Sequence, residues 1–210
     1  MPTPLNNYEI MRDQMAVVFL NYDQEMMIRK FSLRHDEAFL YIRFVGREYR
    51  IDRTTGAVSW EDTEAKTVHP ADYNAAMTIY DVLCCSKENC RASGEMVSIE
   101  SCVSVQGGSL SSQNRGFFQH AADFFDKDPD ALADACEKLG GTRLARGDAA
   151  YRLDVFTFLP VSVAFWRSDE EFSASLQILV DRNILDFMHY ETAMFAICHL
   201  MERLEALCGG

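Results

Sequence analysis

Apolar and polar residues alternate along three consecutive runs near the middle of the second half of the chain. The runs are 151–158, 161–166 and 176–180. They are rich in β-branched and aromatic residues, and an alternation of period two places every second side chain on one face of a strand. Pro160 has no amide hydrogen to donate, so it predicts a turn, a bulge or a strand start between the first two runs. The pattern predicts an antiparallel central meander within residues 143–181. Its expected buried positions are Val155, Val161, Val163, Phe165, Leu176 and Ile178.

A second alternating region predicts another antiparallel meander, the first in the chain, over residues 37–60. Residues 37–45 alternate, Gly46 predicts a turn, and residues 47–51 return as the next strand. Gly56 lies in a second turn, where a left-handed conformation is expected. A third short strand, ending at Trp60, completes this first meander.

Apolar residues recur at helical spacing in the remaining segments. N-terminal helices are expected within 6–31 and C-terminal helices within 184–207. Asp128 followed by Pro129 predicts another helix start, because aspartate caps helices and proline suits the first helical position. His69-Pro70 is interpreted in the same way, as the opening of a helix. Between residues 86 and 114 the periodicity fails, and glycine and serine predict a long irregular connection.

These elements predict an α+β fold in one domain, residues 1–210, with antiparallel meanders packed against several helices that lie mainly on one face. Adjacent strands in the sequence usually pair, so each meander is expected to be contiguous. The pattern leaves open whether the two meanders join in one sheet.

Charge and cysteine content narrow the function classes. The formal net charge is -12, which disfavours nucleic acid and anionic membrane surfaces as partners, because both are bound through Lys and Arg. No apolar run approaches the ~20 residues that span a bilayer. The seven cysteines are an odd number without framework spacing, which indicates reduced thiols in a cytoplasm. The oligomeric state stays open.

Several stretches together resemble a known family. They are GREYRID at 46–52, SIES at 98–101, QGGS at 106–109 and the long stretch 128–181 with its Leu-Pro and Trp…Asp-Glu-Glu-Phe. The chain resembles the uncharacterised prokaryotic family known as domain of unknown function 3786. The resemblance implies no assigned reaction. Some members are fused to an iron–sulfur domain in anaerobes, but this chain contains no Cys-x-x-Cys, which argues against a direct redox role here.

Two clusters of chemically active residues are better explained as ordinary structure. Cys84, Cys85, Cys90 and Cys102 lack the paired spacing of a zinc site, and adjacent cysteines on a helix point about 100° apart. Neither zinc nor a disulfide is therefore expected. Carboxylates Asp169, Glu171 and Asp181 fall near predicted strand ends, where a catalytic or cation-binding cluster is one interpretation and a solvated turn the favoured one. No catalytic residue is assigned.

The glycine–serine connection is the preferred ligand site. Gly107 and Gly108 allow close backbone approach, and the start of a following helix offers free amides to an anion. Arg115 adds a guanidinium and His120 an imidazole, while Phe117 and Phe118 supply an apolar wall. The best hypothesis is thus a non-catalytic module that binds a small anionic ligand or an unidentified cofactor. The alternatives are a protein-interaction module acting through its terminal helices, and an enzyme that uses the carboxylate cluster.

The first hypothesis predicts that Arg115→Ala weakens retention of an anionic ligand while the melting temperature stays nearly unchanged. Protonation of His120, near a pKa of ~6.5, is expected to strengthen binding in mild acid. Native mass spectrometry of the purified protein measures the retained ligand directly.

Overall fold

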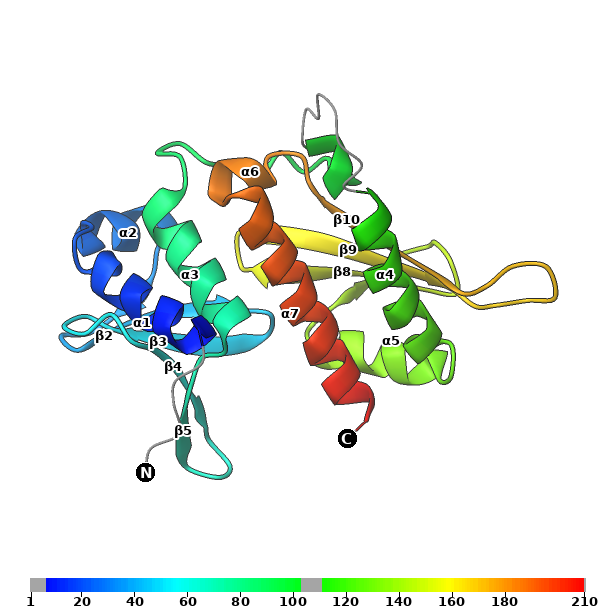
Figure 1. Ribbon diagram of the computed structural model, residues 1–210, viewed down its shortest axis with the longest axis horizontal. Helices are drawn as coiled ribbons and strands as arrows, with labels where there is room; N and C mark the ends of the chain where they lie inside the picture. Colours follow the sequence, from blue (N-terminus) through cyan, green and yellow to red (C-terminus); the bar gives the residue numbers. More distant parts are fainter. Residues whose placement is uncertain (1–6, 103–110, 210) are drawn as a thin grey trace.

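The strands of the computed structural model form one ten-stranded antiparallel sheet (Figure 1). The structure describes residues 7–102 and 111–209, and for residue 100 and residues 111–117 the backbone alone. The main path of the sheet runs β5-β4-β3-β2-β8-β9-β10-β6, with β1 paired to β2 and β7 to β8. The strands are β1 (Arg34–His35), β2 (Phe39–Phe44), β3 (Arg47–Asp52), β4 (Val58–Asp62), β5 (Thr67–Pro70), β6 (Met96–Ser98), β7 (Thr142–Arg143), β8 (Ala149–Phe156), β9 (Leu159–Trp166) and β10 (Ser175–Asp181).

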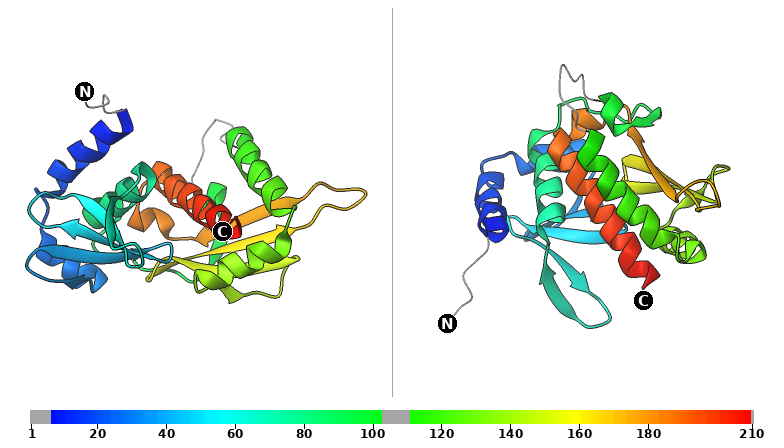
Figure 2. Two further views of the ribbon diagram at one scale, coloured as in Figure 1. Left: turned by 90° about the horizontal axis from the view of Figure 1, so that it is seen from below. Right: turned by 45° about the vertical axis from the view of Figure 1, so that its right-hand side comes forward.

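Helices cover the sheet in the order that the periodicity predicts. They are α1 (Asn7–Phe19), α2 (Gln24–Phe31), α3 (Tyr73–Cys85), α4 (Ser111–Phe125), α5 (Pro129–Lys138), α6 (Ile184–Phe187) and α7 (Tyr190–Cys208), with a 3-10 turn at Ile99–Cys102. Figures 1 and 2 show α3, α4 and α7 together over one face, with α7 running diagonally between the other two. The α+β fold class is confirmed.

The central meander forms as predicted from β8, β9 and β10. Pro160 is the second residue of β9, opposite Asp154, and the ladder is irregular between Asp154 and Phe156. A bulge at this point tolerates the missing amide hydrogen of proline. Five of the six expected core positions are buried, and Leu176 is partly buried.

The two meanders join in one sheet through a short contact between β2 and β8, which we call the joint. It consists of Phe44 and Val45 on one side and Val155 and Phe156 on the other. Phe44 of β2 pairs with Phe156 of β8, and their ring centroids are 4.9 Å apart. The amide of Val45 donates to the carbonyl of Val155 at 2.8 Å. Val45 and Gly46 form the tight turn to β3 with φ of 45° and 72°. A β-branched residue rarely adopts positive φ, so the surrounding contacts must hold Val45 in place.

The predicted helix start at His69-Pro70 is wrong. Both residues belong to β5, and helix α3 begins at Tyr73 after Asp72, whose side chain accepts a hydrogen bond from the amide of Ala75. Proline is compatible with this strand because β5 is the edge of the sheet and Pro70 is its last residue. The dipeptide signal alone does not distinguish a helix start from the end of an edge strand.

Asp181, at the end of β10, is a structural carboxylate. It is fully buried and accepts hydrogen bonds from the amides of Ser93, Gly94 and Asn183 at 2.9, 2.8 and 2.9 Å. The Ser93 hydroxyl adds a fourth bond at 3.0 Å. Burial raises the pKa of Asp181, but the bonds from these donors outweigh it and hold the pKa below its usual value. This carboxylate fixes the connection that precedes β6.

We expect Asp181→Asn to lower the free energy of unfolding by roughly 2–4 kcal/mol, because at this buried position an amide NH2 would face a backbone N–H donor such as that of Gly94. Urea denaturation at neutral pH measures the loss. The depressed pKa stabilises the fold fully above the unfolded-state pKa, and this contribution disappears as the pH falls through the lower folded-state value. The variant should therefore also show a weaker acid dependence of stability.

Asp169→Asn is the matched control. Asp169 accepts the amides of Glu171 and Phe172 in an exposed turn, where asparagine makes the same turn. A change within about 0.5 kcal/mol is expected. Equal losses in the two variants would contradict the special role of Asp181.

Candidate anion-binding site

A hollow of about 880 Å³ opens where the β2–β3 turn, the end of β4 and the last turns of α7 meet. Strands of the first meander contribute arginines and aromatic rings to it, and the turn after β4 contributes acidic residues. Its lining includes Arg34, Tyr41, Arg47, Tyr49, Arg50, Trp60, Glu61, Asp62, Arg203 and Leu207.

Two arginines of this hollow occupy positions that the hydrophobic pattern assigns to the interior. In β3, Arg47 has the same strand phase as Tyr49 and Ile51, which are both fully buried. In α7, Arg203 follows the buried His199 by four residues, one helical turn along the same face. Both guanidinium groups are therefore directed by regular secondary structure toward the helix-covered side of the sheet.

The indole of Trp60 holds Arg47 in place. The guanidinium carbon of Arg47 lies 3.6 Å from the centroid of the Trp60 ring. His69 stacks on the same indole at 4.6 Å with an interplanar angle of 21°. Trp60 is paired with Tyr49 on one side and with His69 on the other, so the stack follows from the register of β3, β4 and β5. The cation–π contact positions Arg47 without neutralising its charge.

Three of the four acidic residues that line the hollow are already engaged, and the fourth is Glu64. Glu48 binds Arg34 at 2.6 Å, and Glu61 binds Arg50 at 3.4 Å. Asp62 accepts the amides of Glu64 and Ala65 at 3.0 and 2.9 Å and so stabilises the turn after β4. Two of the four arginines in the lining are thus paired with carboxylates.

Arg47 and Arg203 have no such carboxylate. Among the described side chains, which exclude residues 100 and 111–117, neither makes an ion pair, and the Nε atom of Arg203 is buried without a hydrogen-bond partner. Burial lowers the pKa of Arg203, and the nearby positive charge of Arg47 lowers it further. A half-buried guanidinium that faces a second one is electrostatically unfavourable. A bound anion would compensate the desolvation of Arg203 and reduce its repulsion by Arg47.

Tyr49 connects the hollow to a buried polar group. Its hydroxyl and Nε2 of His199 are 3.2 Å apart, and Nδ1 of His199 lies 3.3 Å from a carboxylate oxygen of Asp72. Burial raises the pKa of Tyr49, so its hydroxyl remains protonated at neutral pH. Tyr49 therefore lines the hollow as a neutral residue whose buried hydroxyl is already bonded to His199.

The site expected from the sequence falls mostly outside the described residues. Gly107 and Gly108 are not described, and neither is the side chain of Arg115. His120 is exposed on α4 and is absent from the lining of the hollow at Arg47. Anion binding at Gly107–His120 stays a prediction.

The carboxylates do not converge as the alternative enzyme hypothesis requires. Asp169 and Glu171 lie in the exposed hairpin between β9 and β10, whereas Asp181 ends β10. The seven residues of β10 separate them by roughly 20 Å. Asp181 is also saturated with hydrogen bonds from Ser93, Gly94 and Asn183, so this cluster supports no catalytic site.

Comparison with protein families identifies residues 23–203 as a match to the family described as domain of unknown function (DUF3786). The chain belongs to this family. The family match contains all three residues of the Arg47–Trp60–Arg203 arrangement, and GREYRID supplies Arg47. Neither the curated proteins nor the solved structures contain a match to the chain. Among the described residues, every helix is too short or too polar to cross a membrane.

The sequence contained a usable signal for this site. A charged residue in the inward phase of a strand or helix is costly unless it has a partner or a ligand. Arg47 and Arg203 both occupy inward-facing positions, which the sequence alone reveals. That they lie close together depends on how the two meanders join and on the path of α7, which the sequence alone does not reveal.

We expect Arg203→Met to leave the free energy of unfolding unchanged or to raise it by about 1–2 kcal/mol in a buffer without multivalent anions. Methionine retains the packing of the aliphatic stem and removes the buried charge that Arg47 repels. Urea denaturation measures the change. Arg50→Met, which removes an exposed ion pair to Glu61, is the control and should change stability by less than about 1 kcal/mol. A loss above about 1 kcal/mol in Arg203→Met would mean that Arg203 already has a stabilising partner.

Proposed function

We propose that this protein is a non-catalytic module that binds a small anionic ligand between Arg47 and Arg203. The observation that carries the proposal is the pair of guanidinium groups that face one hollow without a carboxylate partner among the described residues. The rest of the chain makes this pair unusual, because the formal net charge is -12. Among the described side chains none forms an ion pair with either group, and Asp62 and Asp72 contribute only a weaker attraction to Arg47 and Arg203 respectively.

The geometry favours a compact ligand with carboxylate or phosphate groups. Guanidinium groups recognise both through paired N–H donors. Arg47 and His69 already contact the Trp60 ring, so this indole positions Arg47 and is not available to stack an aromatic ligand. The acidic rim, which includes Glu61 and Asp62, disfavours a long polyanion such as nucleic acid.

The lining also favours binding over catalysis. It contains no cysteine or histidine among the described residues, and the hydroxyl of Tyr49 is held in its neutral form. Histidine and cysteine are the common acid–base and nucleophilic groups near neutral pH, and the carboxylates Glu48 and Glu61 of the lining are paired with arginines. Arginine does not change its protonation near neutral pH, so the pair acts as a fixed positive clamp.

The proposal predicts that inorganic phosphate and citrate raise the melting temperature of the protein above the value in chloride at equal ionic strength. Ligand binding to the folded state stabilises it by mass action, about 2.7 kcal/mol at one hundred times Kd. Arg203→Met and Arg47→Gln should each lose most of this response. Differential scanning fluorimetry across a concentration series measures it.

Arg50→Gln and Arg115→Ala provide the controls. Arg50 is paired with Glu61 in the same hollow, so its loss should leave the anion response intact. Arg115→Ala tests the other candidate segment, and a response lost only in that variant would move the binding site to Gly107–His120. Equal responses in all variants would show that the anions act on the whole protein rather than at one site.

A second candidate function is protein interaction through α1, and it is favoured by the apolar surface of that helix. Several of its residues are exposed although they are large and hydrophobic. They are Tyr8, Ile10, Met11, Val17 and Val18. Figure 2 shows α1 against the first meander and α3, with its outer side uncovered. Scattered exposed apolar residues are common, but a run of them on one helix is typical of an interaction surface.

A further inference from the structure

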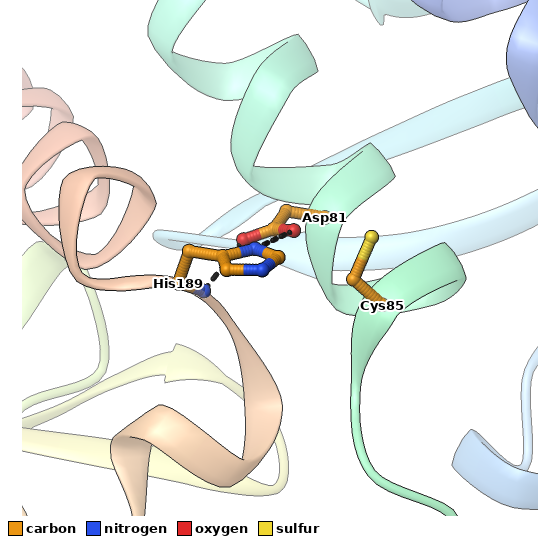
Figure 3. Close-up of side chains that lie close together, drawn as sticks. All are labelled: Asp81, Cys85 and His189. Atoms are coloured by element: carbon orange, nitrogen blue, oxygen red, sulfur yellow. Dashed lines mark hydrogen bonds and ion pairs between the residues drawn. The ribbon is translucent and has the colours of Figure 1, made fainter.

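Asp81, Cys85 and His189 lie together at a second place, where α3 ends and α7 begins (Figure 3). Asp81 and Cys85 are one helical turn apart on α3, and His189 precedes the first residue of α7. The three residues offer one carboxylate oxygen, one thiol sulfur and one imidazole nitrogen, and these atoms lie within 4.8 Å of one another. Metal-binding side chains from distant parts of the chain are thus brought to one point.

Two hydrogen bonds fix the imidazole. Nδ1 of His189 lies 2.7 Å from Oδ1 of Asp81, and the backbone amide of His189 donates to Oδ2 of Asp81 at 2.7 Å. A cation shared by Asp81 and His189 would replace this hydrogen bond. The imidazole proton then resides on Nε2, and Nδ1 and Oδ1 of Asp81 both face the metal. Each carboxylate oxygen of Asp81 also keeps a second lone pair. The bond from the backbone amide of His189 to Oδ2 is unaffected by this exchange and keeps Asp81 beside His189.

The cluster is buried on the side of Asp81 and open to solvent on the side of His189 and Cys85. The side chain of Asp81 is only 11% exposed, whereas that of His189 is 67% exposed and Cys85 lies at the surface. A cation can therefore reach the donors from solvent without rearrangement of the helices. A coordination position on the solvent side would remain for water or another small ligand.

The same three residue types also occur in nucleophilic cysteine sites, but the surroundings oppose that role. Cys85 reaches the surface, but partial desolvation of its thiol raises the pKa to about 11, and the hydrogen bond and charge of Asp81 contribute to the increase. Cys85 is the last residue of α3, where the partial negative charge of the helix end disfavours a thiolate and favours a cation. The thiol is protonated at neutral pH, so a reactive nucleophile is not formed.

We propose that Asp81, Cys85 and His189 bind a divalent cation of the zinc class. Zinc accepts nitrogen, oxygen and sulfur donors together, and three protein ligands with one open position are a known pattern for it. When the metal binds, the thiol of Cys85 forms a metal–sulfur bond and releases its proton to solvent. The cation also offsets the repulsion between a thiolate and the carboxylate of Asp81.

This site is separate from the anion-binding hollow. His189 and Arg203 lie near opposite ends of α7, fourteen residues or roughly 21 Å apart along the helix. The proposal therefore does not depend on anion binding, and each can fail alone. The cysteine spacing gave no sign of this site because two of its ligands are not cysteines.

Cobalt titration of the untagged, chelator-treated protein tests the proposal. Co2+ replaces zinc in such sites and reports thiolate ligation by a near-ultraviolet charge-transfer band. We expect saturation at about one cobalt per chain, loss of the band in Cys85→Ser, and at least a tenfold weaker affinity in His189→Gln. Competition with Zn2+ should bleach the band.

Cys198→Ser and His35→Gln are the matched controls, because they remove a thiol and an imidazole outside the cluster. Both should bind cobalt like the unaltered protein. Circular dichroism establishes that each variant is folded. An unchanged band in Cys85→Ser, or no saturable cobalt binding by the unaltered protein, would overturn the proposal.

Discussion

The contact between Phe44 and Phe156 is the interaction on which the rest of the structure depends. It is the one paired position between β2 and β8, and the adjacent bond from Val45 to Val155 completes the connection between the meanders. Helix α7 covers this joint, because its His199 stacks on Phe44 at 5.0 Å and packs against Tyr49. A sheet of ten strands thus depends on a contact of a few residues beneath one helix.

This arrangement also determines where the two candidate sites lie. Helix α7 reaches Arg203 one turn after His199, so the packing at the joint brings that guanidinium over β3 and toward Arg47. At its other end, α7 begins beside α3, where Asp81 receives the amide of His189. One helix therefore supplies a residue to each site, and neither site lies within a single meander.

Much of the fold could be predicted because its signals are local. Alternation identified β8 to β10, and the capping residue Asp128 marked a helix start that the structure confirms. The joint could not be predicted, because one residue pair carries no periodic pattern. The sites were missed for a related reason. Arg47 and Arg203, or Cys85 and His189, become neighbours only through tertiary packing. The preference for the glycine-rich connection rested on local flexibility, which says nothing about distant partners.

The ends of the open sheet have a consequence for self-association. An unpaired strand edge exposes amides and carbonyls that can template pairing with another molecule. Here the edge strand β5 has four residues and finishes in Pro70, which cannot donate, and the opposite edge β6 has three residues. Both edges are too short to extend a ladder far. The chain therefore resists edge-to-edge polymerisation although its sheet never closes.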